Sequence, residues 1–182
     1  MAILPPEKLV PVAELDAYLM DPTPHDWAKL LAPFCPPLPR EGQVMLASFF
    51  GDVFVEDPDG AVWWVNGLES RVERIAINRD KALERISQDN LVTLKTKLME
   101  QMIRAGRLLP AGMLYGLKVS RADGGRYHPD NVGTAPVAEA FAYLGDQFRR
   151  SNPPSPKAPE TAAVAAPAPK QKQKSGFWGK KK

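Results

Sequence analysis

The feature that most constrains the fold is a run of β-forming residues between 44 and 77, interrupted by two turn signals. The run is rich in Val, Phe, Trp and Ile, which favour strands. The motif Asp57–Gly60 (DPDG) has the residues of a type I turn, and Asn66-Gly67 is a second turn signal. The pattern predicts a hairpin and one further antiparallel strand, at 53–56, 61–65 and near 71–77.

The adjacent residues Trp63 and Trp64 bear on how this sheet is covered. Neighbouring side chains of a strand point to opposite faces, so both indoles cannot enter one core. The strands around them show no clean alternation of apolar and polar residues. We therefore expect helices or a second sheet to cover much of both faces. Either both Trp side chains lie in the core, or one lies at a rim and contacts a partner.

Helices are expected on both sides of the β-rich run. Apolar residues recur at helical spacing in 12–20 and 91–105. Thr23 and Asn78 are suitable N-caps for two further helices, and Thr134 is expected to cap the last one.

The remaining segments complete the prediction of the fold class. Four prolines between residues 33 and 39 predict an extended connector, and residues 113–120 (MLYGLKVS) predict a returning strand. We therefore predict an α+β fold, in which a small hairpin-rich antiparallel sheet packs against several helices. The sheet is expected to comprise residues 44–77 plus a strand near 113–119.

A change of composition at Ser151 divides the chain. Residues 1–40 are expected to be a helical and Pro-rich N-terminal segment, and residues 41–150 a single α+β domain. Residues 151–182 are mainly Pro, Ala, Lys and Gln, with too little apolar mass to offset the entropy of ordering, so a disordered tail is expected.

The charge divides in the same way. Residues 1–150 hold 17 Lys and Arg against 20 Asp and Glu, a net charge of −3, whereas the tail holds seven Lys and one Glu, a net charge of +6. An acidic fold argues against direct nucleic-acid binding by the folded domain. The single cysteine excludes an intrachain disulfide, and neither a signal peptide nor a membrane-spanning run is apparent. We expect a cytoplasmic protein.

Candidate catalytic and metal sites are few, and a structural role is favoured for each. Cys35 with His25 or His128 is a weak candidate for a thiol nucleophile, against a buried structural cysteine. The motif Asp57–Gly60 shares its first residues with calcium loops but lacks their other oxygen ligands, which favours a plain turn. No catalytic residue, metal or cofactor is expected.

Candidate binding surfaces also have two interpretations each. The loop around Gly124-Gly125 has Arg121 and Arg126 beside it, so it either cradles an anion or is structural. The acidic residues of the hairpin either attract a basic partner or keep a sheet edge soluble. Phe177-Trp178 and the tail lysines suggest contact with a membrane or nucleic acid, or else a solubilising or docking tail.

Two stretches together resemble a known bacterial family. Residues 48–76 contain a Phe-Gly-Asp strand, a hairpin with an Asp-Gly turn and an apolar strand that ends near an Ala. Residues 112–150 contain Tyr-Gly-x-Lys, Gly-Gly-x-Tyr, an Asn a few residues on and a last helix with Leu-Gly-Asp. This order resembles the C-terminal domain of immunity proteins that accompany DNase toxins of the type VI secretion system. A Leu is usual in that family where this chain has Asp123.

The resemblance implies an α+β domain without enzymatic activity, which acts as a cytoplasmic antidote by binding and occluding its cognate toxin. The interface residues that we predict come from the hairpin and the Gly-Gly loop: Asp57, Asp59, Trp63, Trp64, Arg126, Tyr127 and Asn131. The alternative function is a non-enzymatic adaptor, whose basic FWGKKK tail docks to a partner, a membrane surface or nucleic acid.

Overall fold

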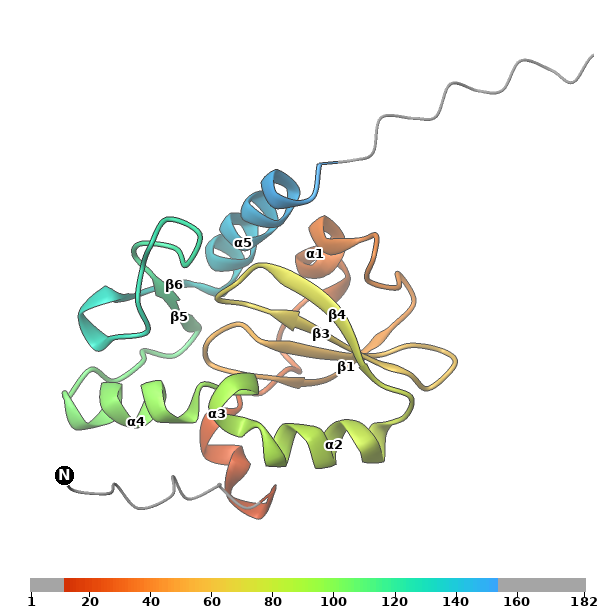
Figure 1. Ribbon diagram of the computed structural model, residues 1–182, viewed down its shortest axis with the longest axis horizontal. Helices are drawn as coiled ribbons and strands as arrows, with labels where there is room; N and C mark the ends of the chain where they lie inside the picture. The colour runs from red at the N-terminus through yellow and green to blue at the C-terminus, as the bar shows by residue number, and fades with distance from the viewer. Residues whose placement is uncertain (1–11, 154–182) are drawn as a thin grey trace, which may run out of the picture.

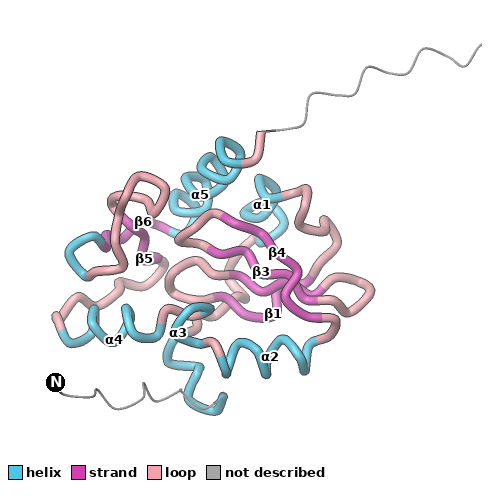
Figure 2. Tube along the Cα trace, in the orientation of Figure 1, coloured by secondary structure: helices cyan, strands magenta, loops and turns pink. Residues whose placement is uncertain are grey.

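The computed structural model describes residues 12–153, which form a four-stranded antiparallel sheet, a separate two-stranded sheet and several helices (Figure 1, Figure 2). The predicted α+β class is confirmed. The larger sheet has the order β1-β2-β3-β4, with strands Gln43–Ala47, Val53–Glu56, Val62–Asn66 and Arg71–Ala76. The smaller sheet pairs β5 with β6, which span Met113–Leu117 and Val132–Pro136.

The α-helices precede the larger sheet, connect it to the smaller sheet and follow the smaller sheet along the chain. The α-helices α1 to α5 span Trp27–Leu31, Arg79–Gln88, Asn90–Thr93, Thr96–Arg104 and Val137–Ser151. The 3-10 helices η1 to η3 span Val12–Tyr18, Ala32–Phe34 and Pro129–Asn131. Helix α5 thus includes Ser151, the first residue that we assigned to the tail, and residues 154–182 of that tail lie outside the described part of the chain.

The predicted hairpin between β2 and β3 is confirmed. Gly60 has a φ of +84°, and its amide donates to the Asp57 carbonyl at 2.9 Å. The Asp57 carboxylate accepts hydrogen bonds from the amides of Asp59 (3.0 Å) and Ala61 (2.9 Å). This turn sets the register that places Val55 opposite Trp63.

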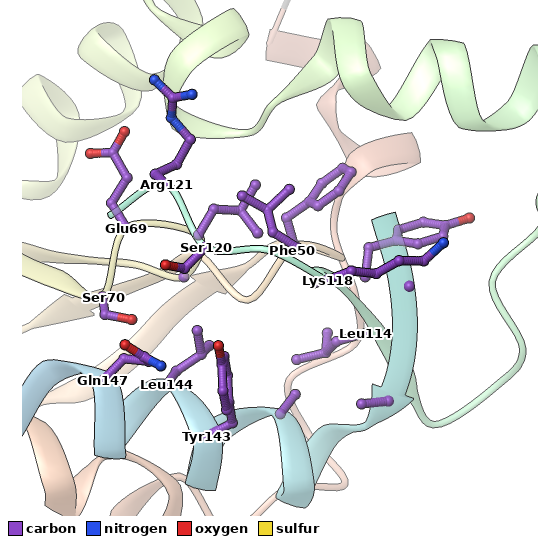
Figure 3. Close-up of a pocket in the computed structure, with 18 of the residues that line it drawn as sticks. Phe50, Glu69, Ser70, Leu114, Lys118, Ser120, Arg121, Tyr143, Leu144 and Gln147 are labelled. Carbon is purple, nitrogen blue, oxygen red and sulfur yellow. The ribbon is translucent and has the colours of Figure 1, made fainter. Parts of the chain in front are cut away.

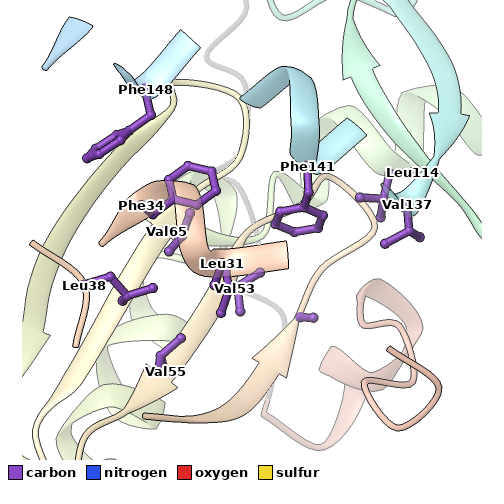
Figure 4. Close-up of a cluster of buried hydrophobic side chains, with 11 residues drawn as sticks. Leu31, Phe34, Leu38, Val53, Val55, Val65, Leu114, Val137, Phe141 and Phe148 are labelled. Atoms are coloured by element: carbon purple, nitrogen blue, oxygen red, sulfur yellow. The ribbon is translucent and has the colours of Figure 1, made fainter. Parts of the chain in front are cut away.

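Helices cover both faces of the larger sheet. Figure 1 shows α1 and α5 on one side of it and α2 and α3 on the other. On the first side lies a cluster of buried residues, drawn in Figure 4: Leu31, Phe34, Leu38, Ala47, Val53, Val55, Val65, Leu114, Val137, Phe141 and Phe148. The cluster on the second side comprises Leu15, Phe54, Val62, Trp64, Ile75, Ala82, Ile86 and Leu94. Trp64 is only 2% exposed, whereas Trp63 is half-buried against the first cluster.

The segment 91–105 is not the single helix that its spacing predicts. Helices α3 and α4 are separated by Lys95, which has a φ of 55° in the left-handed region. A non-glycine residue stays in that region only where its surroundings hold it there. Lys95 is 4% exposed, and its ammonium group donates to the Asp52 carboxylate. A tertiary contact therefore overrides the local helical pattern.

Two expectations near the N-terminal end are corrected. Residues 12–18 form a 3-10 helix, shorter and tighter than the helix predicted for 12–20. Thr23 is not the cap of the next helix, because its amide and hydroxyl donate to the Asp21 carboxylate. Helix α1 begins later, where the Asp26 carboxylate accepts the Lys29 amide at 3.2 Å.

The strand predicted near 113–119 is present as β5, but it does not join the larger sheet. It pairs with β6, and this places Thr134 opposite Tyr115 in the ladder. Thr134 is thus a strand residue and not the expected cap of the last helix, which begins after Pro136. The Tyr115 amide also donates to the Phe49 carbonyl at 2.9 Å, and this bond ties the smaller sheet to the β1–β2 turn.

A buried carboxylate joins the turns at one end of the larger sheet. Asp52 is fully buried and accepts hydrogen bonds from the Ser48 hydroxyl (3.0 Å), the Trp64 indole (3.1 Å) and the Gly67 amide (3.3 Å). The Lys95 ammonium lies 3.2 Å from the same carboxylate. Burial raises the pKa of Asp52, while the Lys95 charge and the hydrogen bonds from Lys95, Ser48 and Trp64 act to lower it.

Substitution of Lys95 by Met should therefore be strongly destabilising. The change leaves the Asp52 carboxylate buried without its counter-charge, which typically costs about 3–5 kcal/mol of unfolding free energy. Urea denaturation at pH 7 measures this loss. Lys29→Met, at an exposed position of α1, is the control and should change stability by less than about 0.5 kcal/mol. Equal midpoints for the two variants would contradict the role given to the pair.

Candidate functional site

A groove with a volume of about 720 Å³ lies between α5, the smaller sheet, the β3–β4 turn and the start of the β5–β6 loop (Figure 3). Helix α5 forms one wall with residues that share a face at spacings of three and four: Glu139, Ala140, Tyr143, Leu144, Gln147 and Ser151. Figure 3 shows Tyr143, Leu144 and Gln147 pointing from this helix toward the groove. Tyr143 is 48% exposed.

The smaller sheet forms the floor of the groove. Strand β5 lines the groove with Leu114, Tyr115, Gly116 and Leu117, and Lys118 follows directly after the strand. Gly116 lies opposite Gly133 in the ladder, and both line the groove. A Cβ atom added at Gly116 would meet no atom within 4 Å. The missing side chain at Gly116 therefore leaves the space above this part of the floor open, whereas a Cβ atom at Gly133 would lie 3.5 Å from the Lys118 side chain.

The β3–β4 turn forms the wall opposite α5 and packs directly on the β1–β2 turn. A Cβ atom at Gly67 would lie 2.4 Å from the Phe50 carbonyl oxygen and 2.5 Å from the Gly51 carbonyl carbon. Only glycine fits this close approach of two backbones. The contact fixes the position of Glu69, Ser70 and Arg71, which line this side of the groove.

The rim carries a cluster formed by Glu69, Arg121 and Tyr127. The Tyr127 hydroxyl donates to the Glu69 carboxylate at 2.8 Å, and the Arg121 guanidinium lies 5.0 Å from the centre of the Tyr127 ring. Partial burial of the phenol raises the pKa of Tyr127 well above its usual range, and the hydrogen bond to Glu69 raises it further. The cluster thus anchors the Gly-Gly loop to the β3–β4 turn.

The Gly-Gly loop is also held from within by Asn131. Its amide group accepts a hydrogen bond from the Val119 amide (2.9 Å) and donates to the carbonyls of Val119 and Arg126 (3.0 Å each). Gly124 has a φ of +86°, and a Cβ atom at Gly125 would overlap the Val119 carbonyl oxygen. These contacts favour the structural interpretation of the two glycines.

The structure separates the residues that we predicted as an interface. Arg126 and Tyr127 are exposed on the loop beside the groove, and Asn131 holds that loop. Asp57 and Asp59 lie in the β2–β3 turn, at the opposite end of β3 from the β3–β4 turn that lines the groove.

The two Trp side chains are tied to carboxylates within the fold. The Trp63 indole donates to the Asp57 carboxylate at 2.9 Å, which lowers the pKa of Asp57, and the buried Trp64 indole donates to Asp52. The contact roles of all seven residues stay a prediction.

Sequence reasoning missed the groove because its walls come from segments that are distant along the chain. The signal that was present is the pair Gly116 and Gly133, two glycines inside strands where glycine weakens a sheet. Their significance depends on the pairing of β5 with β6, which the sequence pattern did not reveal.

The other candidates for chemistry have structural contacts. Burial raises the pKa of the Cys35 thiol, which donates to the Leu31 carbonyl at 3.8 Å. His25 packs edge-on against Trp27 with ring centres 5.5 Å apart, and His128 accepts a hydrogen bond from the Asp130 amide at 3.3 Å. In the described part of the chain, no group of three His, Cys, Asp or Glu is arranged to hold a metal ion.

Comparison with known proteins adds no assignment. No family model matches the chain, and no curated protein matches it. Between residues 12 and 153, none of the helices combines the length and the apolar character needed to cross a bilayer.

The rim cluster predicts a pH-dependent contribution of Tyr127 to stability. Its pKa is higher in the folded protein than the value of about 10 in an unfolded chain. The contribution is therefore fully present below about pH 10 and is lost as the pH rises toward the folded pKa. Tyr127→Phe should lower the unfolding free energy by about 0.5–1 kcal/mol at pH 8, and by less at pH 11.

Urea denaturation of both proteins at the two pH values measures this difference. Tyr143→Phe, on the α5 wall, is the matched control for loss of a hydroxyl. A difference between wild type and Tyr127→Phe that stays constant from pH 8 to pH 11 would rule out the proposed link to the phenol.

Proposed function

We propose that this protein binds another protein through the groove and its rim, and that it acts as a cytoplasmic immunity protein that neutralises a cognate toxin by steric occlusion. The observation that carries the proposal is the contact between Tyr127 and Glu69 at the groove. Tyr127 belongs to the Gly-Gly-x-Tyr motif on which the resemblance to immunity domains rests. The motif thus lies at the rim of a preformed concave surface.

The composition of the rim supports a protein partner. Binding energy at protein interfaces is concentrated in Tyr, Trp and Arg side chains that meet pockets. Tyr127 and Tyr143 are 38% and 48% exposed, and Arg121 and Arg126 lie on the adjoining loop. A stable complex buries about 1,600 Å² in total, so a partner would insert one projecting segment in the groove and cover the surrounding rim.

The charge of the fold supports a basic partner such as a nuclease. Residues 1–150 carry a net charge of −3, and a nuclease needs a basic surface to hold DNA. Complementary charge speeds association and selects the partner. The acidic residues Asp57 and Asp59 lie at the opposite end of β3 from the groove, so they would contribute through the long-range field or through a second contact.

The adaptor alternative places recognition in the tail rather than in the groove. Phe177-Trp178 and the following lysines have the chemistry of a short docking segment. Substitution of Phe177 and Trp178 by Ala in the full chain separates the two functions. An immunity protein should keep its partner after this change, whereas an adaptor should lose it.

Filling the groove should weaken toxin binding. Gly116→Val adds a side chain above the open floor, and valine is favoured in strands. We expect the full chain to co-purify with the toxin encoded by the neighbouring gene and to restore growth of cells that express it. Gly116→Val should lower the affinity at least tenfold, measured by titration calorimetry.

Ala111→Val introduces the same side chain at an exposed position outside the groove and should leave the affinity unchanged. An unchanged affinity of the Gly116→Val variant would show that the toxin binds outside the groove. Failure of the wild-type chain to bind or protect against the toxin would reject the immunity function itself.

A further inference from the structure

The C-terminal segment of the chain begins at the groove. Ser151 is the last residue of α5 and lines the groove, and the described chain continues only to Pro153. At the other end of the chain, Leu15 of η1 packs in the cluster on the opposite face of the larger sheet. Of the two terminal segments, the C-terminal one therefore starts beside the groove.

The length of this segment is sufficient for its end to return to the groove. Phe177 follows Pro153 by 24 residues. A flexible chain of that length has a mean end-to-end distance of about 25–30 Å, and a Pro-rich chain extends further. The radius of gyration of a 140-residue domain is about 14 Å. The connecting segment is therefore long enough for Phe177-Trp178 to contact the groove.

The groove matches the chemistry of this segment. Tyr143 and Leu144 on the α5 wall and Leu114 on the floor give it apolar surface, and Gly116 leaves part of the floor open. Its volume of about 720 Å³ lies within the range of about 300–1,000 Å³ usual for ligand pockets. The segment SGFWGKKK presents two adjacent aromatic side chains between glycines, a compact apolar group of the kind that fills such a pocket.

The charges that line the groove are mixed, with Glu69 and Glu139 beside Arg71, Lys118 and Arg121. Glu139 is exposed on the α5 wall, and Glu69 borders the opposite wall. Each basic residue of the lining has a contact within the fold: Arg121 stacks on Tyr127, Lys118 donates to the Asp130 carbonyl at 2.9 Å, and Arg71 pairs with Glu69 and Glu73. Glu69 is thus engaged as well, and a basic segment would meet its counter-charge at Glu139. The three lysines after Trp178 extend a tail of net charge +6 beside a fold of net charge −3.

We propose that the segment 175–182 (SGFWGKKK) docks in the groove of its own chain, with Phe177-Trp178 in the pocket and the terminal lysines toward Glu139. Tethering gives such a segment an effective concentration of about 1 mM. An intrinsic dissociation constant near 1 mM is therefore enough for half-occupancy. This inference does not rest on the toxin, but a toxin that uses the groove would have to displace the segment.

The test uses the full chain labelled with 5-fluorotryptophan and observed by ¹⁹F NMR. The chain has four Trp residues, and the Trp178→Phe variant identifies the resonance of Trp178. We expect this resonance to differ in shift from the isolated SGFWGKKK peptide and to move toward the peptide value in Gly116→Val. Ala111→Val should leave it in place.

Two further measurements keep the result decisive if Gly116→Val folds poorly. Excess SGFWGKKK peptide should displace the segment and move the Trp178 resonance of the wild-type chain toward the free value. A hundredfold dilution should leave that resonance unchanged if docking occurs within one chain. The proposal would be overturned if the Trp178 resonance of the wild-type chain lay at the free-peptide position or shifted with dilution. It would also be overturned if Gly116→Val folded and left this resonance unchanged.

Discussion

The rest of the structure depends on the hydrogen bonds and the ion pair made by the buried Asp52 carboxylate. It accepts donors from the β1–β2 turn, from β3, from the β3–β4 turn and from Lys95 between α3 and α4. Because a buried charge must be compensated fully, these four segments are held in one arrangement. The same β1–β2 turn binds the smaller sheet through the Phe49 carbonyl. The walls of the groove are thus positioned from one end of the larger sheet.

The edge strands of the larger sheet are poorly suited to pairing with a partner, so the groove is the better surface for recognition. The registers of β1 and β4 each shift by one residue, at Met45 and at Ile75. Bulges of this kind blunt an edge strand against pairing with another chain. The Arg85 guanidinium also donates to the Ile75 carbonyl at 3.1 Å, which occupies a backbone acceptor. A partner would therefore gain more from side-chain contacts in the groove than from addition of a strand.

Sequence reasoning succeeded where the physical cause is local. The Asp57–Gly60 turn and the Asn78 cap of α2 are set by residues within four positions of each other, so the hairpin and this helix could be predicted. The break at Lys95 could not, because its cause is a carboxylate 43 residues away. The strand β6 was missed because Thr134 is also a suitable helix cap, so it was assigned to the start of the last helix. The groove was hidden for the same reason, because its floor depends on the pairing of β5 with β6 and one of its walls on the contact at Gly67.

A groove left open between α5 and the smaller sheet has a cost for a protein in the cell, because exposed apolar walls invite non-specific contact. A weakly docked segment of the same chain limits this exposure without closing the site. If the segment occupies the groove in nine chains of ten, the apparent dissociation constant for a partner rises tenfold. That factor corresponds to about 1.4 kcal/mol, which is small beside the binding energy of a nanomolar complex. Weak partners would be excluded and a tight one would still bind, so self-docking would act as a filter for specificity.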